Sequence, residues 1–106
     1  MSEPDEVEAA LAALRRGYAA ELPDLVRSLA ARMEEAATRP SALDQARREA
    51  HRLRGTAGSY GFAAVGEAAG RIEDALEEGR SVTPDLLGEL AGIARQAAGG
   101  SSRSSK

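Results

Sequence analysis

The sequence has no cysteine and no tryptophan, and only one of its 106 residues is a histidine. Without cysteine, the chain has no disulfide framework, no thiolate zinc site and no cysteine nucleophile. A single histidine also argues against a histidine-based metal centre. Aromatic residues make up 3% of the chain, too few for the stacking platforms that bind single-stranded nucleic acid. We therefore expect no metal site and no nucleic-acid partner.

Long apolar runs are missing as well. The first residues, MSEPDEVEAA, are acidic and do not resemble a secretory signal, and no later stretch is long enough to span a membrane. The formal net charge is −3, so the molecule as a whole does not attract nucleic acid or anionic lipid. We expect a cytoplasmic protein that does not bind membranes.

What the sequence does contain is apolar residues at helical spacing, in five stretches separated by glycine or proline. No stretch alternates as a strand would. We predict an all-α domain over residues 1–98, in which short loops make neighbouring helices antiparallel. Residues 99–106 are polar and begin with glycine, which predicts a disordered tail.

The first two helices are predicted at about residues 5–16 and 19–37. Gly17 is expected to separate them, and the first is short enough to be a lid on the bundle. Pro23 fits best near the first turn of the second helix, where its missing N–H costs little.

The other three helices are predicted at about residues 41–60, 62–79 and 83–97. Ser41 and Asp44 resemble a capping box at the start of the first of these. Glycines are expected to cap the C-termini of the helices ending near residues 60 and 79, and a Thr-Pro pair to start the last one.

The only histidine, His51, points away from the apolar side of its predicted helix. At 100° per residue that apolar side carries Leu43, Ala46, Ala50, Leu53, Ala57 and Tyr60. Polar and small residues surround the histidine within about 60° on the same wheel. They are Asp44, Arg47, Arg48, Arg54, Gly55 and Gly58. We call His51 and these six residues the His51 ridge, and we expect it to be exposed.

The ridge suits a reactive nitrogen that meets a partner. Its cations would stabilise a phosphoryl group on the ring. Gly55 costs about 1 kcal/mol of helix stability relative to alanine, a cost that a closely docking partner would explain. On its own, however, a lone histidine on a helix is more often an ordinary solvated residue. Arg47, Arg48 and Arg52 could equally form a solvated basic face.

The run HRLRGTAGSYGF resembles the signature of the histidine phosphotransfer (HPt) domains of bacterial multistep phosphorelays. That signature reads approximately HxLKGxAxxxG followed by an apolar residue. The matching positions are His51, Leu53, Gly55, Ala57, Gly61 and Phe62, followed downstream by Val65, Ile72 and Glu73. The resemblance extends over roughly residues 5–98. Arg54 stands where lysine is usual, which keeps the charge but changes the donor geometry.

The resemblance implies a four-helix antiparallel up-down bundle core with an additional short N-terminal helix. It also implies that His51 accepts a phosphoryl group from the aspartyl phosphate of a response-regulator receiver domain and relays it to another receiver in two-component signalling. A hybrid histidine kinase is a further candidate partner. By the same resemblance, we expect the chain to need no cofactor of its own, because the receiver supplies the magnesium, and to have no ATP-dependent kinase activity.

The remaining site residues are predicted around this histidine. Arg54 and Arg47 are expected to stabilise the phosphoryl group. The docking surface is expected to include Gly55, Gly58, Ser59 and Arg48, with residues of the preceding helix near Ala30. Two further glycines, Gly66 and Gly70, could either permit close helix packing or open the docking face.

Two alternatives remain open. A helical adaptor could dock a receiver or kinase without transferring phosphate. The dimerising histidine helix of a sensor kinase is disfavoured, because Arg52 follows the histidine where that family carries an acidic residue. That class needs a dimer, whereas we expect a monomer.

Overall fold

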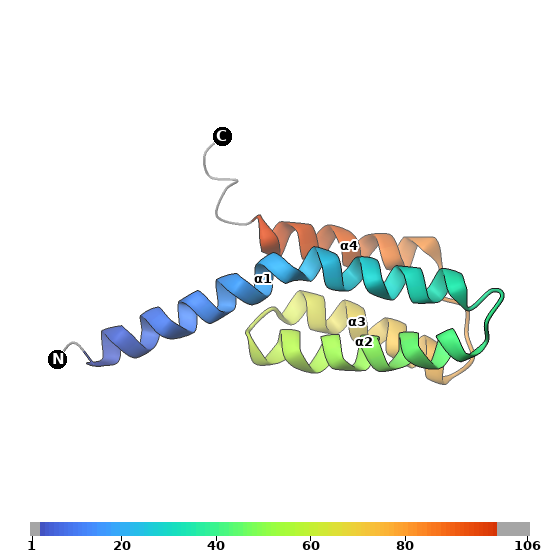
Figure 1. The fold of residues 1–106 in the computed structure, drawn as a ribbon, viewed down its shortest axis with the longest axis horizontal. Helices are drawn as coiled ribbons and strands as arrows, with labels where there is room; N and C mark the ends of the chain where they lie inside the picture. The colour runs from blue at the N-terminus through green and yellow to red at the C-terminus, as the bar shows by residue number, and fades with distance from the viewer. Residues whose placement is uncertain (1–2, 100–106) are drawn as a thin grey trace.

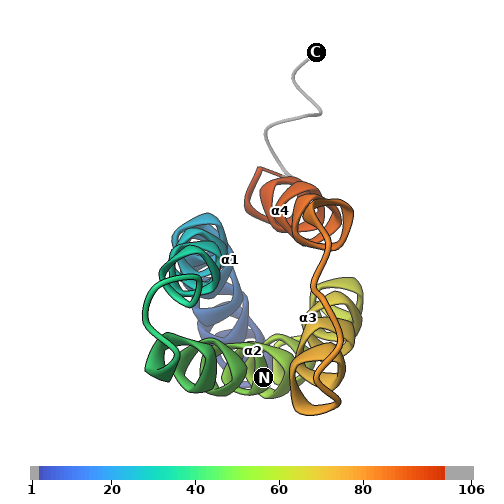
Figure 2. The same ribbon diagram turned by 90° about the vertical axis from the view of Figure 1, so that its right-hand side faces the viewer.

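The computed structural model describes residues 3–99, which form four helices and no strand. Each helix packs against two neighbours in the ring α1–α2–α3–α4, and successive helices run in opposite directions (Figures 1 and 2). The helices are α1 (Glu3–Glu35), α2 (Ser41–Ser59), α3 (Ala63–Glu77) and α4 (Pro84–Ala98). The prediction of an all-helical antiparallel bundle is confirmed.

The additional N-terminal helix is not found, because α1 runs without interruption through Gly17 and Pro23. Gly17 costs about 1 kcal/mol in a helix, which its alanine- and leucine-rich neighbours offset. A proline in a helix interior costs about 3 kcal/mol. The large side chains around Pro23 compensate, since Leu22 and Leu29 are completely buried. The prediction that Pro23 lies in a first turn was therefore wrong.

The N-terminal part of α1 projects beyond the bundle (Figure 1). Every residue in the range 5–17 is exposed, and we call this range the projecting segment. It does not cover the bundle, so the prediction of a lid over residues 5–16 was wrong.

Most of the buried core residues of α2 are alanines, whereas α1 contributes only larger side chains. The buried members of the core are Leu22, Val26, Leu29, Ala46, Ala50, Leu53, Ala57, Val65, Ala68, Ala69, Ile72, Leu90 and Ala94. Alanines let α2 and α3 approach closely. Leu43, predicted to face the core, is 43% exposed, and Ala42 is buried in its place. Leu43 lies in the first turn of α2, at the edge of the apolar sector.

Three of the four helix caps predicted from the sequence are present in the structure. Gly61 and Gly79 have φ of 88° and 74°, the left-handed conformation that favours glycine. The Thr83 side chain accepts a hydrogen bond from the Leu86 N–H at the start of α4. The capping box at Ser41 does not form, because α2 starts there without a side-chain cap.

The predicted tail falls almost entirely on residues 100–106, which lie outside the described residues. Within the described part of the chain, no helix is both long and apolar enough to cross a membrane.

Candidate functional site

His51 lies near the middle of α2, on the side opposite the core. Ala50 and Leu53 are buried beside it, which fixes the rotation of the helix. As expected from the helical wheel, the imidazole faces solvent, with 72% of the side chain exposed.

A buried carboxylate from α3 binds the imidazole. Glu73 is 4% exposed, the one buried charged residue among the described residues. Its Oε2 lies 2.7 Å from His51 Nδ1, and its Oε1 accepts a hydrogen bond from Arg54 Nη1 at 3.1 Å. Glu73 therefore joins the histidine to the cation one turn further along α2.

The electrostatics of Glu73 decide which imidazole nitrogen is available. Burial raises the pKa of Glu73, but hydrogen bonds from His51 and Arg54 outweigh it, and the net pKa lies below the ordinary value. An ionised carboxylate can only accept hydrogen bonds, so the hydrogen between the two groups belongs to Nδ1. In the neutral ring Nε2 is then unprotonated and carries the available lone pair.

The sequence analysis matched Glu73 to an acidic family position but did not predict its contact with His51. A signal was present: Glu73 follows Ala69 by four residues, on the apolar side of α3. A carboxylate on that side needs a partner from another helix.

Two buried glycines of α3 make room for Arg54. A Cβ built at Gly70 would lie 3.1 Å from Arg54 Nε, and one built at Gly66 would lie 3.2 Å from the Arg54 carbonyl oxygen. The structure thus assigns these glycines to close packing of α2 and α3 rather than to an open docking face. Arg54 Nη1 also lies 3.7 Å from a carboxylate oxygen of Asp74.

Arg47 and Arg48 are held by a carboxylate of their own helix. Asp44 Oδ1 lies 2.8 Å from Arg47 Nη2, and Asp44 Oδ2 lies 2.6 Å from Arg48 Nη2. The hydrogen bond from Arg47 and the charge of Arg48 lower the pKa of Asp44. Of the two arginines predicted to stabilise a phosphoryl group, Arg54 shares a partner with His51, whereas Arg47 is paired with Asp44 and lies 3.9 Å from Glu77.

Packing within the chain does not require small residues beside His51. A Cβ at Gly55 or Gly58 would meet nothing within 4 Å, and Ser59 is also exposed. The cost of a glycine inside α2 is therefore not offset by a contact within the described chain.

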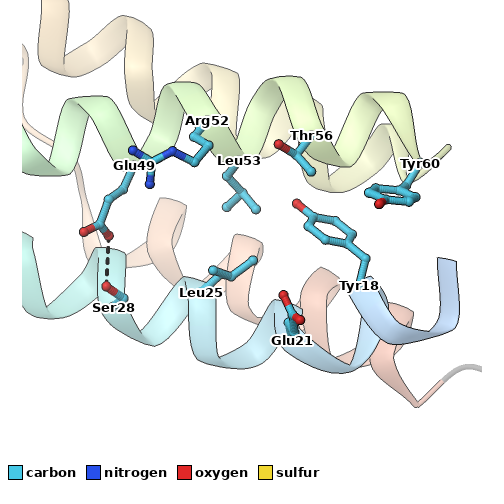
Figure 3. Close-up of a pocket in the computed structure, with 9 residues that line it drawn as sticks. All are labelled: Tyr18, Glu21, Leu25, Ser28, Glu49, Arg52, Leu53, Thr56 and Tyr60. Carbon is cyan, nitrogen blue, oxygen red and sulfur yellow. Dashed lines mark hydrogen bonds between the residues drawn. The ribbon is translucent and has the colours of Figure 1, made fainter. Parts of the chain in front are cut away.

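A pocket of about 390 Å³ lies between α1 and α2 (Figure 3). Tyr18 and Tyr60 stack at one end of it, with ring centroids 4.7 Å apart. The Tyr18 hydroxyl is buried without a hydrogen-bond partner among the described residues. Burial first, and then the charge of Glu21, raise the pKa of Tyr18. The sequence analysis did not predict this pocket.

Within residues 3–99, no three histidine or acidic side chains come together as metal ligands. The family model for the Hpt domain matches residues 5–99, which include His51, Glu73 and all of α2 to α4. Comparison with curated proteins gives no match, and comparison with solved structures gives none.

Proposed function

Because the chain belongs to the Hpt domain family, whose members carry phosphoryl groups on histidine in phosphorelays, we propose that His51 is the carrier in this protein. Hpt domains interact with response-regulator receiver domains and are carriers rather than kinases. The family match confirms the resemblance found in the sequence. The observation that supports the choice of residue is the exposed His51 imidazole, bound through Nδ1 to the buried Glu73 carboxylate.

In the proposed reaction, the lone pair of His51 Nε2 attacks the phosphorus of a receiver's aspartyl phosphate. The new N–P bond forms as the P–O bond to the aspartate breaks, and the electron pair of that bond stays on the aspartate carboxylate. Positive charge develops on the ring, and the Glu73 carboxylate stabilises it through the Nδ1–H. Transfer to a second receiver is the reverse of this step.

Arg54 is proposed to stabilise the phosphoryl oxygens. Its contacts to Glu73 and Asp74 both use Nη1, and a guanidinium carries further N–H donors on its other nitrogens. Arg54 can therefore keep Glu73 and also donate to a phosphoryl group, which the single nitrogen of a lysine does less readily. Arg47 would have to leave Asp44 first, so its contribution is proposed to be smaller.

The receiver is proposed to dock on the His51 ridge. The open space over Gly55 and Gly58 lets a partner surface approach the imidazole closely, and Ser59 extends this smooth area. Arg48 lies at the rim, where charge affects association rate and selectivity more than affinity. We also propose that the magnesium of the reaction is the receiver's, and that the relay places this chain in the cytoplasm.

Incubation with a phosphorylated receiver tests the proposal. The chain is expected to gain an acid-labile, base-stable phosphoryl group that is lost in His51→Gln, a variant whose circular dichroism should match wild type because the side chain is exposed. The host's complete set of receivers is used, since pairing is selective. Absence of labelling by every receiver would overturn the proposal, and transfer to His51→Gln would exclude His51 as the carrier.

A further inference from the structure

The projecting segment of α1 carries an apolar stripe that no described part of the chain covers. Val7, Leu11 and Leu14 are 57%, 56% and 56% exposed. With Tyr18 they fall in one sector of about 60° on the helix. Tyr18 lies on the side of α1 that faces α2 (Figure 3). The stripe thus continues the bundle-facing side of α1 beyond the end of the bundle (Figure 1).

A helix in this position needs a packing surface. Isolated helices of about 12–15 residues are marginal in water, and Gly17 at the base of the segment weakens it further. The bundle of the same chain does not supply that surface, since residues 5–17 are all exposed. Arg15, near the base of the segment, contacts the loop between α2 and α3. Arg15 Nε donates to the Tyr60 carbonyl at 2.7 Å, and its guanidinium lies 4.6 Å from the centroid of the Phe62 ring.

The spacing of the stripe is the same when read in either direction. The steps from Val7 to Leu11, Leu14 and Tyr18 are four, three and four residues. An antiparallel second copy therefore places its Leu14 opposite Leu11 and its Val7 opposite Tyr18, which is half-buried against Tyr60. The two chains then contribute the same surface to a two-fold symmetric contact.

The charges of the segment favour the same orientation. Asp5, Glu6 and Glu8 lie near its start, and Arg15 and Arg16 near its end. Glu8 and Arg15 lie on the same flank of the stripe, so antiparallel pairing brings Glu8 of one copy near Arg15 of the other. Parallel pairing would bring like charges together.

We propose that the projecting segments of two copies of this chain pair as antiparallel helices through the exposed Val7, Leu11 and Leu14, with the half-buried Tyr18 at the end of the contact. The contact buries much less than the roughly 1,200–2,000 Å² of a stable complex, so the pairing is weak and depends on concentration. The proposed pairing differs from the monomer expected from the sequence. His51 is not part of this surface, and the pairing does not depend on the proposed phosphotransfer.

Sedimentation equilibrium of the full chain, from about 10 µM to about 1 mM, tests the pairing in the range where such small contacts are populated. The average mass should rise from the 11.0 kDa of one chain towards twice that value. Leu11→Ser should remain monomeric. Ala13→Ser, which introduces the same residue on the other side of the helix, should associate like wild type. A wild-type mass that stays at one chain, or a Leu11→Ser variant that associates like wild type, would overturn the proposal.

Disulfide trapping tests the orientation, because the chain has no cysteine of its own. Leu11→Cys and Leu14→Cys variants carrying tags of different mass are mixed and oxidised. Antiparallel pairing should make the mixed disulfide exceed its random share several-fold. A predominance of disulfides between identical variants would show parallel pairing and contradict the proposed contact.

Discussion

Replacing Glu73 by glutamine removes the charge beside His51 with little change in side-chain size. In the proposed reaction, the carboxylate stabilises positive charge on the ring across the 2.7 Å contact to Nδ1. A glutamine carbonyl can still accept from Nδ1 but is neutral. Its amide also faces Arg54, a donor, where the carboxylate accepted a hydrogen bond. We therefore expect slower transfer in a protein that is still folded.

The size of the effect follows from the strength of the hydrogen bond. A bond with an ionised partner contributes about 1.5–3 kcal/mol, compared with about 1 kcal/mol for a neutral pair. The substitution thus removes about 0.5–2 kcal/mol of stabilisation. At about 1.36 kcal/mol per factor of ten this is about 2- to 30-fold in rate. Because His51 is 72% exposed, water screens the charge, and we expect the lower part, about 3- to 10-fold.

The assay is the initial rate of phosphoryl transfer from a phosphorylated receiver under single-turnover conditions. Glu77→Gln is the matched control, since Glu77 is an exposed carboxylate one turn further along α3 that faces Arg47 at 3.9 Å. It should transfer within about twofold of wild type. A folded Glu73→Gln that transfers at the wild-type rate would contradict the proposed role of the Glu73 charge, as would an equal loss in Glu77→Gln.

Three further predictions concern the same site. Gly55→Ala should raise the free energy of unfolding by about 1 kcal/mol in urea denaturation, because the added Cβ meets nothing within 4 Å. Gly55→Trp should block phosphoryl transfer while the helical circular dichroism stays intact. Normal transfer in Gly55→Trp would exclude close docking at this position. Arg54→Lys should retain most of the transfer rate. Arg54→Ala should lose about tenfold or more in rate, because a charged hydrogen bond contributes about 1.5–3 kcal/mol. Equal transfer rates in the two variants would contradict the role of a cation at this position. The pKa of Glu73 is lowered in the folded protein. Its contribution to stability is therefore complete above the ordinary glutamate pKa of about 4.3 and is lost as the pH falls through the lower folded pKa. Glu73→Gln should lose less unfolding free energy than wild type between pH 7 and about pH 2, and parallel pH profiles of the two proteins would contradict this.

Periodicity in the sequence predicted most of the bundle, because helices that bury one side must repeat apolar residues every three or four positions. It also predicted the outward direction of His51, since that depends only on the neighbours within α2. The ability of Gly17 and Pro23 to interrupt α1 was overestimated. A glycine or proline has a fixed local cost, but the burial of Leu22, Val26 and Leu29 belongs to the tertiary structure and outweighed it.

The contacts that make the site chemically specific are between helices, and these the sequence did not predict. The bond from His51 to Glu73 depends on how closely α2 approaches α3, which Gly66 and Gly70 permit. The pairing of Arg47 with Asp44, by contrast, is a contact of residues three apart and could have been predicted from helix geometry.

We propose that His51 carries the phosphoryl group on Nε2 because Glu73 occupies Nδ1. Nitrogen-15 NMR of the labelled chain, recorded after phosphorylation by a receiver, tests this directly, since the two ring nitrogens have distinct resonances and only the phosphorylated one couples to phosphorus. We expect coupling at Nε2 and a proton retained on Nδ1. Phosphorus coupled to Nδ1, or a phosphorylated chain with an unmodified His51, would contradict it.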